Sequence, residues 1–472
     1  TYEVINPATE EVIGKASKAT PQDVERALNS AKKGLEVWRK TAPWQRSYII
    51  RRIADKMREK QDVLAKWMTL EVGKPLAEAK GEINGAADIF EWNAEETKRI
   101  FGQTVESRFE DTRVHVYYQP VGVVAALSPW NFPAVLSARK IATALAAGCS
   151  VIIKPDVITP GVVMEMVDIC NECGVPPGVV NLLSGDPPSI AQQLIASDII
   201  KKISITGSSR VGKLILKQAA DKVQRVTMEL SGHSPFIVFK DADIKKATDM
   251  AIAAKFRNNG QVCISPNRFY IQEEKKDEFV NLFVEKTKKL KIGNGMDPDT
   301  NLGPLTTQKR LNEVETLVEK TKKEGAKVLL GGKRPSGFNK GFFYEPTVFD
   351  NITSEMDIVT EESFSPVIPI QKVASMSEAV EMANSTKYGL GCTIFTKDIE
   401  RALTAADKIK SGTVCINSPL MENIAAPFGG MKQSGIGREH GVEALEEFRE
   451  AKHIFIDYDH NKKDWWFGEE DQ

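Results

Sequence analysis

The spacing of apolar side chains changes from helical to alternating along the N-terminal part of the chain. Apolar positions recur every three or four residues between 22 and 38, and Thr20-Pro21 before them is a typical helix start. The same spacing predicts a second helix from about 47 to 70 and a third over about 76–100. At Arg113–Tyr118 (RVHVYY) apolar and polar residues alternate, which predicts a strand.

From residue 121 onward, short apolar runs alternate with helical stretches. The first set of expected strands is Val121–Leu127, Ser150–Ile153, Val179–Leu183, Lys202–Thr206, Val226–Leu230 and Pro235–Phe239. The second set is Arg268–Gln272, Ala326–Leu330, Pro366–Lys372, Thr393–Thr396 and Thr413–Asn417. Alternation of this kind favours parallel sheets covered by helices on both faces, so we predict an α/β protein with two such domains.

The composition is that of an ordinary folded protein of several domains, with 472 residues, 42% of them hydrophobic and 27% charged. The formal net charge of −1 argues against nucleic acid or an anionic membrane as a partner. No apolar run reaches the ~20 residues of a membrane helix, and the first residues lack the pattern of a signal peptide. Six scattered cysteines favour reduced thiols, so we expect a cytoplasmic protein.

The segment GSSRVGK, from Gly207 to Lys213, nearly matches the loop that cradles phosphates in ATPases and kinases. Leu214 stands where that loop needs a hydroxyl for Mg²⁺, which disfavours a P-loop phosphotransferase. A glycine turn between a strand and a helix can still hold the pyrophosphate of a dinucleotide. It can also be a purely structural turn.

Three other features of the sequence give weaker evidence for a catalytic or metal-binding role. Cys170-x-x-Cys173 lacks further metal ligands and lies at the end of a helix, so two buried structural thiols are expected. Gly435-Ile-Gly437 is expected to be a loop, and the spacing of the five histidines predicts no metal site. A lone cysteine is more often a core residue than a nucleophile, but Cys263 follows a helix that breaks at Gly260 and has polar neighbours, which modestly favours a functional role. These residues alone indicate an α/β enzyme that binds a nucleotide.

The segment FRNNGQVCIS around Cys263 resembles the nucleophile segment of the aldehyde dehydrogenase superfamily, in particular of its semialdehyde-oxidising members. Seven further segments resemble that family and lie in its order along the chain. The first six are SPWNFP from Ser128, Lys154-Pro155, the turn at Gly185, TGS from Thr206, ELSGHSP from Glu229 and EESFSP from Glu361. PFGGMKQSG from Pro427 follows near the end.

The resemblance implies a Rossmann-like cofactor domain formed by residues 1–101 and 121–231 and a catalytic domain over 232–448. Residues 102–120 and 449–472 would form a small β extension for oligomerisation, together with a tail. The expected assembly is a homodimer or a homotetramer. In the tail, Trp465, Trp466 and Phe467 form an apolar cluster, which we expect to dock on the body or on a neighbouring subunit.

The resemblance also assigns roles. Cys263 would attack the aldehyde, Asn131 would stabilise the oxyanion, and Glu229 would activate water to release a free acid. The expected cofactor-binding residues are Ser128, Pro129, Trp130, Lys154, Val157, Gly185, Gly207, Ser208, Leu230, Glu362 and Phe364. Because all three catalytic residues are present, a non-catalytic binding relative is disfavoured.

The cofactor is expected to be NADP in preference to NAD. Members that prefer NAD usually carry a glutamate where this chain has Val157, and that carboxylate would repel the 2′-phosphate of NADP. Lys154 could then pair with the phosphate. Asp156 lies one residue before Val157 and could restore part of the negative charge.

The substrate residues implied by the resemblance are Phe132, Arg139, Arg257 and Glu422. Arginines at 139 and 257 match members that oxidise succinic semialdehyde, since two guanidinium groups suit an anionic tail. Glu422 replaces the serine of that pattern. It could cancel part of the positive charge or bind a substrate hydroxyl, so a hydroxyaldehyde such as lactaldehyde or glyceraldehyde stays as the alternative substrate.

Overall fold

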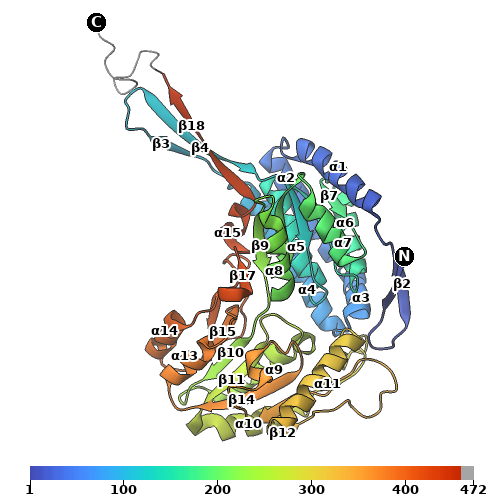
Figure 1. Cartoon of the computed structure of the whole chain (residues 1–472), viewed down its shortest axis with the longest axis vertical. Coiled ribbons are helices and arrows are strands. Elements are labelled where there is room, and N and C mark those ends of the chain that lie inside the picture. The colour runs from blue at the N-terminus through green and yellow to red at the C-terminus, as the bar shows by residue number, and fades with distance from the viewer. Residues whose placement is uncertain (459–472) are drawn as a thin grey trace.

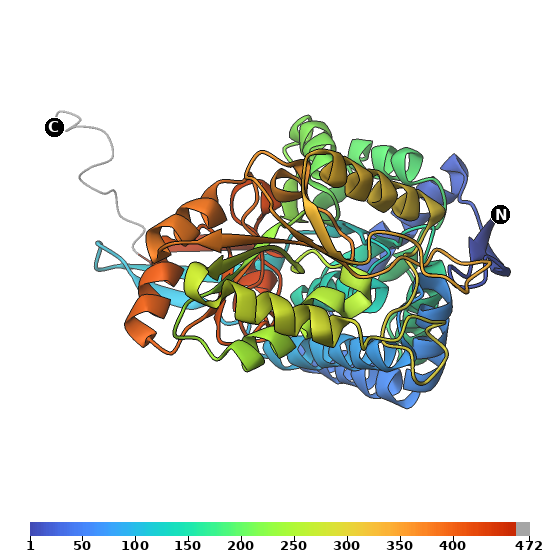
Figure 2. The same ribbon diagram turned by 90° about the horizontal axis from the view of Figure 1, so that it is seen from below.

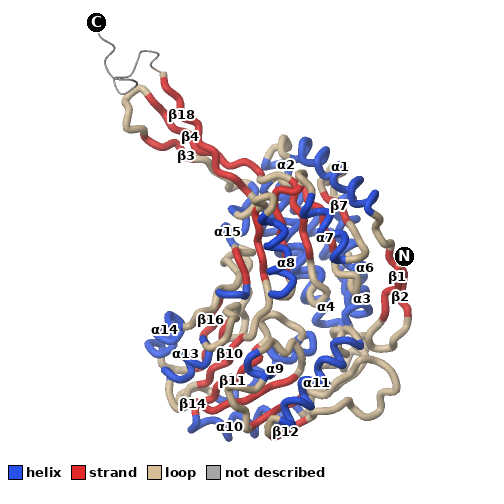
Figure 3. Tube along the Cα trace, viewed as in Figure 1, coloured by secondary structure: helices blue, strands red, loops and turns tan. Residues whose placement is uncertain are grey.

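The computed structural model describes residues 1–458, which form two α/β lobes and a projecting arm (Figure 1). The helices are α1 (Pro21–Trp38), α2 (Pro43–Glu59), α3 (Gln61–Val72), α4 (Leu76–Thr97), α5 (Pro133–Ala147), α6 (Pro160–Glu172), α7 (Pro187–Ala196), α8 (Ser209–Ala220), α9 (Ile244–Phe256), α10 (Glu273–Thr287), α11 (Gln308–Lys323), α12 (Asp357–Thr360), α13 (Met376–Asn384), α14 (Ile399–Lys408) and α15 (Gly441–Glu446). In both lobes the strands lie between helices (Figure 3).

The first lobe is built on a six-stranded sheet of order β17-β9-β8-β5-β6-β7. Its strands are β5 (Val123–Leu127), β6 (Ser150–Lys154), β7 (Val180–Leu182), β8 (Ile200–Thr206), β9 (Arg225–Glu229) and β17 (Gly435–Ile436). All are parallel except β17, which is antiparallel to β9. Alternate residues of β5 pack on opposite faces: Val124 contacts the core formed with α2–α6, and Val123 the core formed with α1, α7 and α8.

The second lobe is built on a seven-stranded sheet of order β12-β13-β14-β11-β10-β15-β16. Its strands are β10 (Ser234–Val238), β11 (Pro266–Gln272), β12 (Lys327–Leu330), β13 (Thr347–Asp350), β14 (Val367–Val373), β15 (Gly391–Phe395) and β16 (Thr413–Ile416). Only β12 is antiparallel to its neighbour within this sheet of the described chain. Helices α9 and α10 cover one face and α13 and α14 the other, as the view from below shows (Figure 2).

The arm is an antiparallel sheet of order β18-β4-β3 that projects from the first lobe (Figure 1). Its strands are β3 (Gln103–Glu106), β4 (Thr112–Pro120) and β18 (Arg449–Asp457), and β4 is the central strand that pairs with both β3 and β18. A separate hairpin, β1 (Tyr2–Ile5) and β2 (Val12–Ala16), lies near the N-terminus. No helix within residues 1–458 is long and apolar enough to cross a membrane.

The structure corrects three expectations. The helix expected over about 47–70 is two helices, α2 and α3, because the chain turns at Lys60. Gly435 and Ile436, expected in a loop, form strand β17, which completes the edge of the first sheet. The hairpin β1–β2 and strand β13 were not predicted. The tail cluster of Trp465, Trp466 and Phe467 lies outside the described residues.

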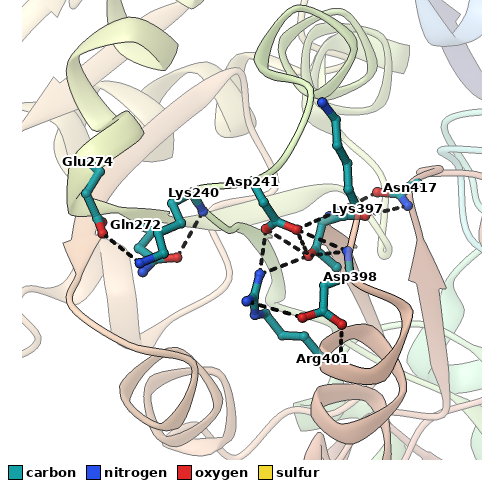
Figure 4. A network of polar contacts seen from close by, with 9 residues as sticks. Lys240, Asp241, Gln272, Glu274, Lys397, Asp398, Arg401 and Asn417 are labelled. Atoms are coloured by element: carbon teal, nitrogen blue, oxygen red, sulfur yellow. Dashed lines mark hydrogen bonds and ion pairs between the residues drawn. The ribbon is translucent and has the colours of Figure 1, made fainter.

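Polar contacts at the carboxyl ends of β10, β15 and β16 fix the far edge of the second sheet (Figure 4). Asp241 accepts hydrogen bonds from the Thr396 hydroxyl and pairs with Arg401 at 2.6 Å. The side chain of Asn417 bonds in both directions to the backbone of Thr396. Asn417 is therefore held where the chain leaves β16 towards Met421 and Glu422.

We predict that Gly34→Ala destabilises the protein. Gly34 lies in α1, where alanine ordinarily favours the helix over glycine by about 1 kcal/mol. A Cβ at Gly34, however, would lie 2.2 Å from the backbone of Gly178, and such overpacking costs roughly 1–3 kcal/mol. The melting temperature of Gly34→Ala should fall.

Gly81→Ala is the matched control, because Gly81 lies inside helix α4 with nothing within 4 Å of its added Cβ. Its melting temperature should stay the same or rise. A Gly34→Ala protein as stable as Gly81→Ala would show that the close packing of α1 on Gly178 does not constrain the fold.

Candidate active site

Two cavities meet at Cys263 between the lobes. The larger, of about 410 Å³, lies over the carboxyl ends of β5, β8 and β9. Of the predicted site residues it is lined by Pro129, Trp130, Asn131, Gly207, Ser208, Glu229, Leu230, Cys263, Glu362 and Phe364. The smaller cavity is narrow and is lined by Phe132, Val135, Leu136, Arg139, Arg257, Val262, Cys263 and Glu422. It brings together all four predicted substrate residues.

Four predicted cofactor residues do not line the larger cavity. Ser128 follows β5 and accepts a hydrogen bond from the Ser137 hydroxyl. Lys154 is buried at the end of β6, and Val157 is half-buried just after it. Gly185 has φ +134° in the turn before α7, a conformation that favours glycine.

The loop that carries Cys263 has an unusual backbone. Asn258, Asn259 and Gly260 have φ of 47°, 55° and 74°, and these residue types tolerate the left-handed region best. A Cβ at Gly260 would lie 2.2 Å from the carbonyl oxygen of Ser365. The break of the helix at Gly260 that the sequence indicated is thus a sharp turn, which aims Cys263 into both cavities.

Asn131 is fixed by a buried ion pair that the sequence did not reveal. Glu82 of α4 pairs with Lys74 at 2.5 Å and accepts hydrogen bonds from the first amides of α5. Lys74 Nζ also donates to the backbone carbonyl of Asn131 at 2.7 Å. One side-chain N–H of Asn131 donates to the carbonyl of Gln261 at 3.1 Å. The second amide hydrogen of Asn131 is therefore available to an oxygen beside Cys263.

Burial controls the protonation of Glu229 and Cys263. Glu229 is 1% exposed, and neither carboxyl oxygen has a hydrogen-bond partner of normal geometry, although the Cys263 thiol lies close enough to interact. Burial, and next the nearby carboxylate of Glu439, raise the pKa of Glu229 to about 8. Burial and the proximity of Glu229 raise the pKa of Cys263 well above its ordinary value. Both groups therefore favour the protonated form more than they would in water.

A buried network of four charges lies beside these two residues. Arg139 pairs with Glu422 at 2.7 Å and with Glu439 at 3.1 Å, and Lys140 pairs with Glu439 at 2.6 Å. Although burial disfavours a charged carboxylate, Lys140 and Arg139 lower the pKa of Glu439 to about 2. The network is therefore two cations balanced by two anions. The ion pair of Glu422 with Arg139 agrees with the hypothesis that Glu422 cancels part of the positive charge.

Sequence reasoning missed Lys74, Glu82, Lys140 and Glu439. A signal existed for Lys140, because Arg139 and Lys140 interrupt a helix whose other residues are almost all apolar or small, and every residue of α5 is buried. Two adjacent cations on such a helix require buried anions. The partners themselves, Glu422 and Glu439, are about 300 residues away in the chain, and no local pattern identifies them.

The larger cavity has the donors that a dinucleotide needs. Gly207 and Ser208 stand at the start of α8, and the Ser208 hydroxyl accepts from the amide of Val211, so this is a capped helix N-terminus. On the opposite wall, Glu362 accepts from the amide of Gly232 at 3.1 Å. The rings of Trp130 and Phe364 meet edge to face at 5.6 Å. A phosphate site, a carboxylate for ribose hydroxyls and apolar ring walls together fit NAD(P).

Comparison with known proteins gives consistent matches over nearly the whole chain. Residues 1–454 match the sequence profile of the aldehyde dehydrogenase family. A glutarate-semialdehyde dehydrogenase of Pseudomonas putida is 41% identical over 456 residues, which cover 97% of this chain and 94% of that protein. An NADP-dependent succinate-semialdehyde dehydrogenase of Escherichia coli is 38% identical, with 96% and 94% covered.

The crystal structure of a succinate-semialdehyde dehydrogenase from Burkholderia pseudomallei superposes with a TM-score of 0.95 at 40% identity. The superposition covers 97% of this chain and 94% of that one. This similarity confirms the predicted fold class, a Rossmann-like domain with an α/β catalytic domain.

We predict that Glu229→Gln accelerates the alkylation of Cys263 by iodoacetamide at pH 8–9 several-fold. Ionised Glu229 raises the pKa of the Cys263 thiol, and glutamine keeps the shape but removes the charge. Because the pKa of Glu229 is about 8, the difference from the natural protein should be small at pH 7 and should grow as the pH rises.

The rate should be measured in a Cys415→Ser background, because Cys415 is the other partly exposed cysteine of the described chain. Slower alkylation in Glu229→Gln would instead mean that Glu229 takes the proton of the thiol.

Proposed function

Because the chain belongs to the aldehyde dehydrogenase family, as its motifs predicted, we propose that it oxidises an aldehyde with an anionic far end, such as succinic semialdehyde, and prefers NADP. Members of this family are NAD(P)-dependent oxidoreductases, and this chain is one of them. The observation that carries the choice of substrate is the position of Arg257 at the wall of the small cavity, with no ion pair to any residue in 1–458.

The residues around Cys263 support a thioester mechanism. Cys263 Sγ, as the thiolate left when the thiol proton passes to solvent, would add to the carbonyl carbon of the aldehyde, giving a thiohemiacetal anion whose oxygen accepts from the Asn131 amide and the Cys263 backbone N–H. Bound NAD(P) supplies the acceptor for the hydride. A thioester on Cys263 remains, and Glu229 in its ionised form would take a proton from the water that hydrolyses it.

The charges around the small cavity favour an anion. Arg139 and Lys140 are each paired, with Glu422 and Glu439, so these four groups have no net charge. Arg257 adds one positive charge and lies over the ring of Phe132 at 4.6 Å. Its guanidinium can therefore bind a carboxylate at the far end of a substrate whose aldehyde lies at Cys263. Of the two arginines expected to clamp the substrate, Arg139 is paired with Glu422, whereas Arg257 has no ion pair within residues 1–458, although it acts on Glu78 and Glu422 by its charge.

The surroundings of Lys154 support the preference for NADP. Lys154 is buried and has no hydrogen bond or ion pair among residues 1–458, and burial lowers its pKa. One oxygen of the Asp156 carboxylate accepts from the backbone N–H of Ile158 at 3.0 Å, which orients this side chain. Val157 adds no charge. A 2′-phosphate would therefore meet a lysine without an ion pair among residues 1–458, although the charges of Asp156 and Asp186 act on that lysine as well.

A hydroxyaldehyde is the second candidate substrate, and Glu422 is the observation that favours it. Arg139 donates to one carboxylate oxygen of Glu422. The Glu422 side chain is about one-third exposed beside the cavity. The second oxygen can accept a hydrogen bond from a substrate hydroxyl. The two proposals are compatible if the substrate has both an anionic end and a hydroxyl.

The arm and the location complete the proposal. We propose that the arm of β3, β4 and β18 serves self-association into a homodimer or homotetramer, as the family resemblance implies. Strand β18 is nine residues long and exposes Ile454 and Phe455. The protein would act in the cytoplasm without a nucleic acid or membrane partner.

We predict that Val157→Glu shifts the cofactor preference towards NAD. A carboxylate at 157 would repel the 2′-phosphate and bind the ribose hydroxyl instead. The ratio of kcat/KM for NADP to kcat/KM for NAD should fall about tenfold or more, measured as absorbance at 340 nm. Val157→Gln, which has the same length without the charge, should change the ratio much less. A natural protein that prefers NAD a hundredfold would contradict the proposal.

We predict that Arg257→Ala lowers kcat/KM for succinic semialdehyde about ten- to a hundredfold, because a charge-assisted hydrogen bond contributes roughly 1.5–3 kcal/mol. An uncharged aldehyde of similar length should be affected only weakly. Equal losses for both aldehydes would show that Arg257 is structural, and the anionic substrate would then be wrong.

Glu422→Ser distinguishes the two candidate substrates in the same assay. If the substrate carries only an anion, freeing Arg139 should improve the oxidation of succinic semialdehyde. If a hydroxyl is bound by Glu422, the substitution should lower activity on glyceraldehyde or lactaldehyde instead.

A further inference from the structure

Lys255 is a buried cation that the proposed chemistry does not use. It lies in the last turn of α9 with 0% exposure, and its Nζ donates to Asn267 Oδ1 at 2.6 Å. No carboxylate of residues 1–458 lies within ion-pair distance of it. Burial lowers the pKa of Lys255 to about 7, although the charge of Glu362 opposes this. A buried ammonium group without a counter-ion destabilises a fold, so its presence calls for a reason outside stability.

The position of Lys255 suggests that reason. Lys255 and Asn267, the second residue of β11, stand at the two ends of the loop that carries Cys263. Their hydrogen bond closes the base of this loop. Asn267 Oδ1 also accepts from the hydroxyl of Ser363 at 3.1 Å, and Asn267 is 0% exposed.

Ser363 belongs to the segment Glu362–Phe364 on the opposite wall of the larger cavity. Phe364 has φ 46°, a conformation that costs free energy for a residue other than glycine and persists only when its surroundings hold it. Arg310 donates to the carbonyls of Ser363 and Phe364 at 2.9 and 3.0 Å from one side. The Ser363 side chain, bonded to Asn267, holds the segment from the other.

We propose that Lys255 is a positioning residue that, through Asn267 and Ser363, fixes the loop of Cys263 relative to the segment Glu362–Phe364. The inference rests on the proposed role of that segment in holding the nicotinamide ribose. Lys255 contacts neither substrate nor cofactor. It aligns the group that attacks the aldehyde with the wall that holds the cofactor, at the expense of stability.

The test compares Lys255→Met with the natural protein. Methionine keeps a long unbranched side chain and removes the charge and the hydrogen bond. We expect the Kd of NADP, measured by quenching of tryptophan fluorescence, and its KM to rise about tenfold. The KM of the aldehyde should change little, and the melting temperature should stay the same or rise. A merely structural role predicts the opposite, a lower melting temperature with uniform loss of activity.

A second variant does not depend on the folding of Lys255→Met. Ser363→Ala removes only the bond to Asn267 and should raise the Kd of NADP about three- to tenfold. If both residues act through Asn267, the effects of the two substitutions should not add in the double variant. Thr248→Val is the matched control, because Thr248 is buried on the same helix and its hydroxyl bonds only to the carbonyl of Ile244.

Three results would overturn the inference: additive effects, an unchanged Kd in both variants, or a similar change in Thr248→Val. A Glu362→Gln variant distinguishes a wrong positioning role of Lys255 from a wrong assignment of the cofactor site. If Glu362→Gln leaves the Kd of NADP unchanged, the segment Glu362–Phe364 does not hold the cofactor. Both its proposed role in cofactor binding and the positioning role of Lys255 are then wrong. If Glu362→Gln weakens binding while Lys255→Met and Ser363→Ala do not, only the positioning role is wrong.

Discussion

The backbone of the loop that carries Cys263 is the constraint on which the site depends. Asn258, Asn259 and Gly260 have positive φ in succession, and such a turn is costly unless neighbouring groups hold it. The holding groups come from both lobes. Asn258 donates to the carbonyl of Asn131 in the first lobe, and Asn259 donates to the carbonyl of Gly303. The hydrogen bonds that stabilise the turn therefore also fix how the two lobes meet. The same contacts determine where Cys263 lies and how the site between the lobes is closed.

The buried charges follow from this closure. A site from which water is excluded strengthens every electrostatic interaction, so each ion near Cys263 needs a partner. Lys74 has Glu82, Lys140 has Glu439, and Arg139 has Glu422. Glu229 and Arg257 are exceptions, because neither has an oppositely charged group within ion-pair distance among residues 1–458. Burial without a paired cation raises the pKa of Glu229. A carboxyl group that titrates near pH 8 can hold a proton or release it under ordinary conditions, which is what a group that must activate water requires.

How far the sequence predicts this structure depends on the range of each interaction. Local patterns predicted strand β5, since a run buried on both faces is apolar throughout. The motifs also identified residues that the fold does bring together, such as Asn131, Glu229 and Cys263 around one cavity. Patterns within a few residues could not predict the pair of Arg139 with Glu422, or the role of Lys74, because their partners are set by the packing of distant elements. The turn at Lys60 was missed for another reason: α2 and α3 are both amphipathic and continue the same spacing with one residue between them.

The segment of Asn131 explains why two binding specificities can coexist around one thiol. Trp130 faces the larger cavity, where its ring meets Phe364, and Phe132 faces the smaller one, where its ring lies under Arg257. Asn131 stands between them, and this is where its amide must be, since the oxyanion forms on a carbon that lies between the cofactor and the rest of the substrate. Because this segment and Cys263 separate the cavities, a charge near Val157 would act mainly on the cofactor, whereas a charge at Glu422 acts on the substrate side and on the Cys263 thiol, whose pKa it raises. Substrate preference can therefore change at Arg257 and Glu422 without disturbing the residues that hold the dinucleotide, as long as the turn at Asn258–Gly260 keeps the thiol between them.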